Sequence, residues 1–556
     1  MKGLTQMANR KTKTTALVLA LAMCVGLLSG CGSDQDVTES PDDVEVIEIG
    51  QELKEEYMAD KVFTLNYEKA ATLNPIKAES SENMMFAGLV YDTMFVVDEN
   101  FEVSSNIVLD YESGDYEWWI FHVDTSVKFH DGSNLTAKDV AYSINRAMRY
   151  SYYSGRLDCV YGVSALDEDT LAISTTYPNA QFPSRLTIPI IKYDSMDDYA
   201  PPGTGPYMFS EETESLVLFE ENPRAANMPL DEIYLADYTE TTAKISAFED
   251  SRIDIVTNDP TGMFHLGYGS SNESRFYNTT NFHYLGFNME SLFFTSSAMR
   301  YAMMYAVDRE NLVENLMNDC GLVTTLPVSP VSTLYNSTYA DNFGYDMEKC
   351  KAIFDNAGIA DHDYDGQLEF IIWNIIVEIN IKFIVNNDSS VKVQTARQIA
   401  EDLNAIGIKT TLYELDWDDY IDALERGNYD MYYGEIRMTP DWNLGYLFDP
   451  DDFNTCGEKP TNEREEEIFP DVGMNYSGCG DPAYTQLYND YLAADELTRY
   501  DKYQEVCRYV IENGGIVPIC FEKREVLTHR GIVSGINPTQ YDLFNDFENW
   551  DINFER

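Results

Sequence analysis

The 556-residue chain is poor in basic residues: 38 Lys and Arg stand against 95 Asp and Glu, a formal net charge of −57 at pH 7. A charge of this size and sign repels nucleic acid and acidic membrane surfaces. Long apolar runs are also scarce, since only residues 16–28 approach the length of a membrane span. The composition predicts a soluble acidic protein that does not bind nucleic acid, and it identifies no ligand.

Catalytic signatures are equally scarce. The six histidines form no pair at helical spacing, and the chain contains no G-x-S-x-G elbow, no H-E-x-x-H helix and no P-loop. Acid–base catalysis by a pair of carboxylates is an alternative, but a chain with 95 acidic residues contains many such pairs, so none of them indicates a catalytic site. We therefore predict no catalytic residue and no cofactor, and keep a surface-anchored hydrolase as the least favoured alternative.

The cysteines offer no zinc site of their own, because no C-x-x-C spacing occurs. Besides Cys24 and Cys31, seven cysteines remain, so at least one is unpaired within the chain. Cys456 and Cys479 bracket a polar loop that contains glycine, and we expect them to be the first pair to join in an oxidising exterior.

The N-terminus has the features of an export signal. Residues 1–30 carry four basic residues and no acidic one, and residues 16–28 form an apolar core of 13 residues. Leu28-Ser29-Gly30-Cys31 resembles a bacterial lipobox, in which the cysteine is acylated and becomes the mature N-terminus. We expect residues 1–30 to be a lipoprotein signal peptide, Cys31 to carry the lipid, and residues 31–50 to form an acidic tether outside the cytoplasmic membrane. A chance cysteine after an ordinary signal peptide is the alternative.

Residues 368–442 alternate between strand and helix patterns. Residues 368–373 predict a strand, residues 391–406 a helix that Gly407 ends, and residues 408–415 a second strand. Asp416 is placed to cap a further helix that ends at Gly427, and residues 429–433 predict a third strand. This alternation predicts an α/β domain with a parallel sheet.

Ligands of parallel sheets bind at the carboxyl ends of the strands. This rule selects Trp373, Asn374, Glu435 and Arg437 as candidate ligand-binding residues. The alternative is that they are ordinary polar residues of the loops after the strands.

Residues 116–140 begin with a predicted strand, followed by a turn at Phe129-His130-Asp131-Gly132 and a helix capped by Thr136, with Asp139 in the capping box. Residues 127–140 resemble the hallmark segment of the family 5 extracellular solute-binding proteins, the peptide-binding components of ABC importers. The segments 203–207, 247–255, 284–288, 299–309, 405–408 and 516–519 resemble further parts of the same family in order and spacing. The resemblance covers nearly everything after Lys61.

This resemblance implies a bilobed periplasmic-binding-protein-like fold of type II, with the three-part architecture of family 5 and a ligand cleft between the lobes. Lobe I would combine residues 51–95, 199–275 and 515–556 with an inserted domain at 96–198, and lobe II would hold residues 276–514. The implied function is a lipid-anchored monomer that captures a solute, most simply a peptide, and delivers it to the permease subunits of an ABC transporter. A peptide receptor that serves signalling is the alternative.

One departure from the family pattern concerns the ligand's amino terminus. In peptide-binding relatives, the strand equivalent to residues 429–433 tends to be followed by Gly-Trp and then an aspartate. In this chain Gly434 is followed by Glu435. We expect Glu435 or Asp441 to receive an ammonium group, Arg437 to bind a carboxylate, and Trp373 and Trp442 to supply apolar walls. The alternative is that Glu435 and Arg437 neutralise each other.

A calcium-like motif stands at Asp361, Asp363, Asp365 and Gly366. Ile372 occupies its twelfth position, where a bidentate Glu is usual, although Glu369 at the ninth could contribute. We therefore expect a solvated turn and no bound metal, with a calcium site as the alternative.

Overall fold

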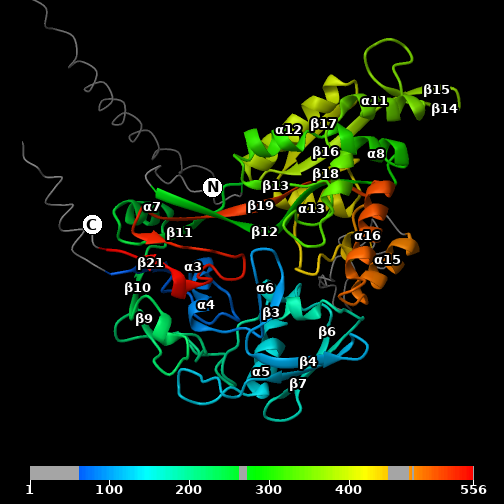
Figure 1. Cartoon of the computed structure of the whole chain (residues 1–556). Helices are drawn as coiled ribbons and strands as arrows, with labels where there is room; N and C mark the ends of the chain where they lie inside the picture. Colours follow the sequence, from blue (N-terminus) through cyan, green and yellow to red (C-terminus); the bar gives the residue numbers. More distant parts are fainter. Residues whose placement is uncertain (1–61, 262–271, 449–474, 479–480, 555–556) are drawn as a thin grey trace, which may run out of the picture. The chain divides into compact units, whose positions relative to one another are not determined.

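The computed structural model describes residues 62–261, 272–448, 475–478 and 481–554 (Figure 1). All of them belong to one compact unit, residues 59–556. The predicted signal peptide, Cys31 and the tether lie outside the described residues, as do Cys456 and Cys479. The described cysteines are buried and unpaired: Cys159, Cys320, Cys350, Cys507 and Cys520.

The largest element is a mixed sheet in which β12 (Asn272–Phe287) and β19 (Ile516–His529) are the longest strands. They pair antiparallel with each other, and their other edges carry different sets of strands. β12 continues to β18 (Met431–Arg437), β16 (Asn380–Asn386) and β17 (Lys409–Leu415). β19 continues to β11 (Ile255–Asn258), β1 (Thr64–Tyr67), β10 (Glu232–Asp237), β9 (Ser215–Leu218) and β8 (Tyr207–Ser210), and also pairs with β13 (Gly321–Val323).

Two large apolar cores flank this arrangement. The first combines β12, β16, β18 and β19 with helices whose apolar faces are buried: α8 (Ser297–Ala306), α11 (Met347–Asn356), α12 (Ser390–Ala405), α13 (Trp417–Glu425), α15 (Pro482–Leu492) and α16 (Arg499–Asn513). The second combines β1 and β10 with α3 (Ser81–Met85), α4 (Ala87–Val90) and a separate four-stranded sheet. A small third core includes the buried residues Ala247 and Phe248 of α7 (Thr241–Glu249).

The four-stranded sheet has the order β4 (Val108–Ser113), β5 (Trp118–Val123), β7 (Thr170–Thr175), β6 (Val160–Ala165), and α5 (Ala137–Ala147) packs beside it. The predicted capping box is confirmed, because Thr136 and Asp139 satisfy each other's backbone N–H groups. The predicted apolar face is confirmed as well, since Val140, Ile144 and Ala147 are fully buried.

Shorter elements connect these parts. Two small sheets are formed by β2 (Phe95–Val97) with β3 (Val103–Ser105) and by β20 (Val533–Ser534) with β21 (Asp551–Ile552). The short helical turns are α6 (Ser151–Ser154), α9 (Arg309–Asn311), α10 (Ser337–Ala340) and α14 (Gly445–Phe448), with 3₁₀ turns at Phe182–Arg185, Ala225–Asn227, Asp341–Phe343 and Phe547–Asn549 and a π turn at Leu312–Leu316.

The alternating pattern of residues 391–437 is confirmed in α12, β17, α13 and β18. Asp416 caps α13 by accepting from the Asp419 N–H, and Gly407 and Gly427 end the two helices with φ values of 88° and 63°. The predicted parallel arrangement holds for β17 and β18, which both pair parallel with β16, a strand that was not predicted, whereas β18 pairs antiparallel with β12. The sheet is therefore mixed.

The prediction that residues 368–373 form a strand of this sheet is wrong. β14 (Glu369–Ile372) forms a separate two-stranded sheet with β15 (Ile375–Glu378), and the tight turn between them consists of Trp373 and Asn374, both at positive φ. The strand that precedes α12 in the sheet is β16. The apolar pattern predicted strand correctly, but the two-residue turn folds it back on the following segment before it can join the sheet.

No helix within the described ranges is long and apolar enough to cross a membrane.

Candidate ligand-binding site

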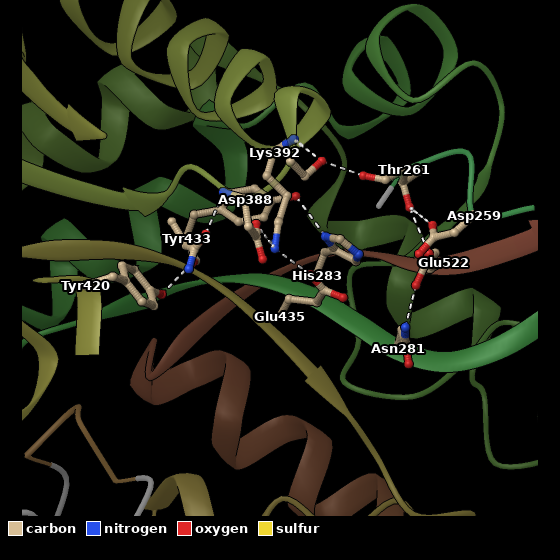
Figure 2. A network of polar contacts seen from close by, with 12 residues as sticks. Asp259, Thr261, Asn281, His283, Asp388, Lys392, Tyr420, Tyr433, Glu435 and Glu522 are labelled. Carbon is tan, nitrogen blue, oxygen red and sulfur yellow. Dashed lines mark hydrogen bonds and ion pairs between the residues drawn. The ribbon is translucent and has the colours of Figure 1, made fainter. Parts of the chain in front are cut away.

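Three neighbouring strands, β18, β12 and β19, bring a cluster of polar side chains together (Figure 2). The polar cluster is defined by His283 of β12, Glu435 of β18 and Glu522 of β19, whose nitrogen and oxygen atoms lie within 4.8 Å of one another. His283 stands directly opposite Glu435 in the ladder. Next to Glu435, Gly434 leaves room for the Tyr284 ring, which a Cβ at this position would meet at 2.4 Å.

Glu435 is held by a lysine from the first turn of α12. Lys392 Nζ donates to Glu435 Oε2 at 3.0 Å and lies 2.6 Å from Asp388 Oδ1. Burial opposes ionisation of both partners, but His283 and Lys392 lower the pKa of Glu435, and Glu435 and Asp388 raise the pKa of Lys392. The pair is therefore ionised at neutral pH, and the Glu435 side chain keeps 31% of its surface exposed.

Glu522 is buried and behaves differently. Thr261 Oγ1 donates to one of its oxygens at 2.8 Å, and Asn281 Nδ2 donates to the other. Burial, followed by the hydrogen bond with the Asp259 carboxyl, raises the pKa of Glu522 to about 8. Arg524 compensates in part, since its Nη2 lies 3.2 Å from Asp259 Oδ2 and its Nε 3.6 Å from Glu522 Oε1.

His283 supplies a ring nitrogen without a partner. The residue is 2% exposed, and its Nδ1 lies 3.0 Å from the Tyr433 hydroxyl. Its Nε2 is buried and has no hydrogen-bond partner within the part of the chain that the structure describes. Burial lowers the pKa of His283, so the ring is neutral at neutral pH. A buried polar atom without a partner is costly, which makes this position one that a ligand can stabilise.

Arg437 follows Glu435 by two positions, so the two side chains lie on the same face of β18. They do not neutralise each other, because Glu435 pairs with Lys392 and Arg437 forms no ion pair with any described residue. The Arg437 guanidinium instead lies over the Tyr152 ring, with its central carbon 5.8 Å from the ring centroid. The exposed Arg437 is available to an anionic ligand group.

Asp441 and Trp442 do not join the cluster. Asp441 is 2% exposed and bonded to Arg185 and Asn179, so it has no exposed oxygen to offer an ammonium group. Trp442 is also 2% exposed and packs edge-on against Phe101 and Phe521. The structure contradicts the expectation that these two residues face a ligand, because both are committed to contacts within the protein.

Trp373 and Asn374 are likewise away from the cluster, in the turn of the β14–β15 hairpin, where Trp373 is 92% exposed.

Of the six predicted ligand-binding residues, only Glu435 and Arg437 lie at the cluster or on its strand. Sequence reasoning missed His283, Glu522, Asp259 and Lys392. A signal was present for Glu522, since Glu522-Lys523-Arg524-Glu525 interrupts an apolar strand with four charged residues.

Comparison with known proteins identifies the family. Residues 102–456, more than half of the chain, match the model described as "Bacterial extracellular solute-binding proteins, family 5 Middle". The heme-binding protein A of Haemophilus influenzae is 23% identical over 56% of this chain, which spans only about three fifths of that relative's length (61%). The oligopeptide-binding protein AppA of Bacillus subtilis is 20% identical, over 77% of this chain and 79% of its own.

A solved structure described as a nickel ABC transporter from Bacillus halodurans superposes with a TM-score of 0.68 at 18% identity, covering 87% of this chain and 98% of its own. The likeness confirms the predicted α/β, bilobed periplasmic-binding-protein-like fold class. The predicted ligand cleft between lobes stays a prediction. The extent of the family match shows that the chain belongs to family 5 of the bacterial extracellular solute-binding proteins.

Proposed function

We propose that the protein is a lipid-anchored extracellular binding protein that captures a peptide or a similar solute and delivers it to the permease of an ABC importer. Family 5 solute-binding proteins serve transport outside the cytoplasm and are not enzymes. The polar cluster is the observation that carries the proposal for the ligand, because it is acidic and has a buried nitrogen without a partner among the described residues.

The charge balance favours a cationic ligand group. Four carboxyl groups converge here, those of Asp259, Asp388, Glu435 and Glu522, and Lys392 and Arg524 form ion pairs with them. An ammonium group would approach the exposed Glu435 and find oxygen acceptors on both sides. Arg437, on the same face of β18, would hold the carboxylate of a zwitterion such as a short peptide.

A metal cation or metal chelate is the second candidate. His283 Nε2 with Glu435 and Glu522 forms an imidazole and carboxylate set, which suits nickel, zinc or iron. One similar protein is named a heme-binding protein and one similar structure a nickel transporter. The neutral state of His283 agrees with this candidate, since a metal binds only the unprotonated ring nitrogen.

The remaining parts of the proposal rest on the sequence. Residues 1–30 would be removed, Cys31 would carry the lipid, and residues 31–50 would form the tether of a monomeric protein. Residues 51–95, 199–275 and 515–556 would form lobe I with the insertion 96–198, and residues 276–514 would form lobe II. β12 and β19 would then carry the chain between the lobes, because β12 crosses the boundary at residue 275 and β19 begins beside the boundary at residue 515.

The test is a binding experiment with two ligand classes. The purified protein is incubated with a peptide mixture and, separately, with nickel and zinc salts, and retained species are identified by mass spectrometry. The first candidate is supported if the wild type retains a peptide, Glu435→Gln does not, and Glu401→Gln, an exposed variant of α12, still does. Retention of metal that His283→Ala abolishes supports the second. If neither class is retained, the cluster is a structural network.

A further inference from the structure

Residues 361–369 bring four carboxyl groups to one place, away from the polar cluster. Asp361, Asp363, Asp365 and Glu369 each have an oxygen within 4.8 Å of the others. The loop turns at Gly366, whose φ of +96° favours glycine, and leads directly into β14. Hydrogen bonds within the loop hold Asp361, which accepts from the N–H groups of Asp365 and Gly366 at 3.1 and 3.0 Å.

Glu369 provides the independent observation that indicates a ligand. Its side chain is fully buried, unlike those of the aspartates, and it is the first residue of β14. Glu369 Oε2 accepts from the His362 N–H at 2.7 Å, whereas Oε1 is buried without a hydrogen-bond partner anywhere in the described chain. None of the four carboxyl groups forms an ion pair with a described Lys or Arg. A buried carboxylate oxygen with neither donor nor cation is strongly unfavourable.

We propose that Asp361, Asp363, Asp365 and Glu369 bind a calcium ion. Carboxylate oxygens are the ligands that calcium prefers, and it accepts six to eight of them in irregular geometry. The loop offers aspartates at the first, third and fifth positions and glycine at the sixth, and the Gln367 carbonyl stands at the seventh. Ile372 cannot act at the twelfth position, so Glu369 closes the coordination shell from the ninth position instead.

The expectation of a solvated turn without metal came from that missing twelfth ligand. The structure favours a calcium site over the solvated turn. Glu369, which the sequence spacing treats as a minor contributor, has the buried oxygen without a hydrogen-bond partner among the described residues. An ion here would tie the loop to the first residue of β14 and so fix the base of the β14–β15 hairpin. Dissociation constants of 10⁻⁴ to 10⁻³ M are typical of extracellular calcium modules and would be sufficient outside the cell.

The experiment uses the full purified protein, stripped with EDTA, and titrates calcium chloride by calorimetry while thermal unfolding is followed in parallel. We expect one calcium ion per chain and a melting temperature that rises with calcium concentration. Glu369→Gln and Asp363→Asn each weaken calcium binding by at least about 30-fold, because each removes one charged ligand. Asp418→Asn, which removes an exposed carboxylate from α13, binds as the wild type does.

The calcium-free proteins supply a second readout. Without the ion, Glu369→Gln should melt at or above the wild-type temperature, because the amide oxygen still accepts from His362 while an uncompensated charge disappears. Three results would overturn the proposal: no heat and no melting shift up to about 10 mM calcium, an equal response to magnesium, or wild-type calcium binding by both variants. Asp363 is exposed, so its variant decides the question if Glu369→Gln fails to fold.

Discussion

Arg185 and Asp441, 256 positions apart in the sequence, form a fully buried ion pair, with Arg185 Nε donating to Asp441 Oδ2 at 2.7 Å. Asn179 and Thr439 also donate to the Asp441 carboxylate. Arg185 Nη1 forms a second ion pair, with Asp158 Oδ1 at 2.6 Å. Arg185 follows the four-stranded sheet in the chain, and Asp441 follows β18 of the large sheet. The pair therefore links two parts of the chain that follow different sheets.

The first prediction concerns this pair. Arg185→Met should lower the free energy of unfolding by about 3–5 kcal/mol, because it leaves the Asp441 charge buried without its cation. Asp441→Asn should cost less, since Asp158 still compensates Arg185. Urea unfolding followed by circular dichroism measures both changes.

Glu414→Gln is the matched control for that prediction. Glu414 forms two hydrogen bonds with Arg397, but the two side chains lie at the surface, with 35% and 55% of their area exposed, so the loss of this pair should cost no more than about 1 kcal/mol. If Arg185→Met is no more destabilising than Glu414→Gln, the buried pair does not hold the two parts together.

Local sequence patterns predicted the elements whose signals lie within a few residues. Thr136 and Asp139 fixed the start of α5, and Asp416 and Gly427 bounded α13, because caps act on neighbouring backbone groups. The hairpin at Trp373 was missed because two positive-φ residues, neither of them glycine, make its turn. Sequence propensity does not predict such a turn.

The polar cluster was mostly beyond sequence reasoning for a different reason. His283, Glu435 and Glu522 meet only because β12 pairs with both β18 and β19, and such pairings are set by the packing of the whole sheet. Glu435 was found because it follows a recognisable strand. Asp441 was misassigned because its sequence position resembles that of a ligand residue, whereas its partner Arg185 lies in a distant segment.

The second prediction concerns pH. The pKa of Glu522 is raised from 4.5 to about 8, so the folded state holds its proton more tightly than the unfolded state. The stabilisation from this proton is complete below about pH 4.5 and disappears as pH rises through about 8. Glu522→Gln keeps a neutral side chain, so its melting temperature should fall less than that of the wild type between these pH values. Equal slopes would show that Glu522 does not titrate in this range.

The third prediction concerns the proposed anchor. Cys31→Ser removes the only thiol that the lipobox-like segment offers for acylation, so the variant should leave the membrane fraction or stay unprocessed. Detergent phase partitioning and intact mass measurement distinguish these outcomes. Cys24→Ser, within the same apolar segment, is the control and should be processed and anchored normally. A Cys31→Ser protein that is still cleaved and lipidated would refute the assignment.

The last prediction separates ligand contact from structural support on β18, and it depends on the proposed function. Arg437 forms no ion pair with a described residue and is exposed, so Arg437→Ala should leave the melting temperature of the ligand-free protein nearly unchanged. A ligand carboxylate that loses this partner in a water-poor site should bind about 30-fold or more weakly, equivalent to at least about 2 kcal/mol.

Calorimetry with a retained peptide measures that affinity, and Arg426→Ala, which removes an exposed arginine from the end of α13, is the control. Arg437→Lys should restore affinity only in part, because lysine keeps the charge but not the two parallel donors. Wild-type affinity in Arg437→Ala would place the ligand's carboxylate elsewhere. A large fall in its ligand-free melting temperature would instead show that the contact with Tyr152 is structural.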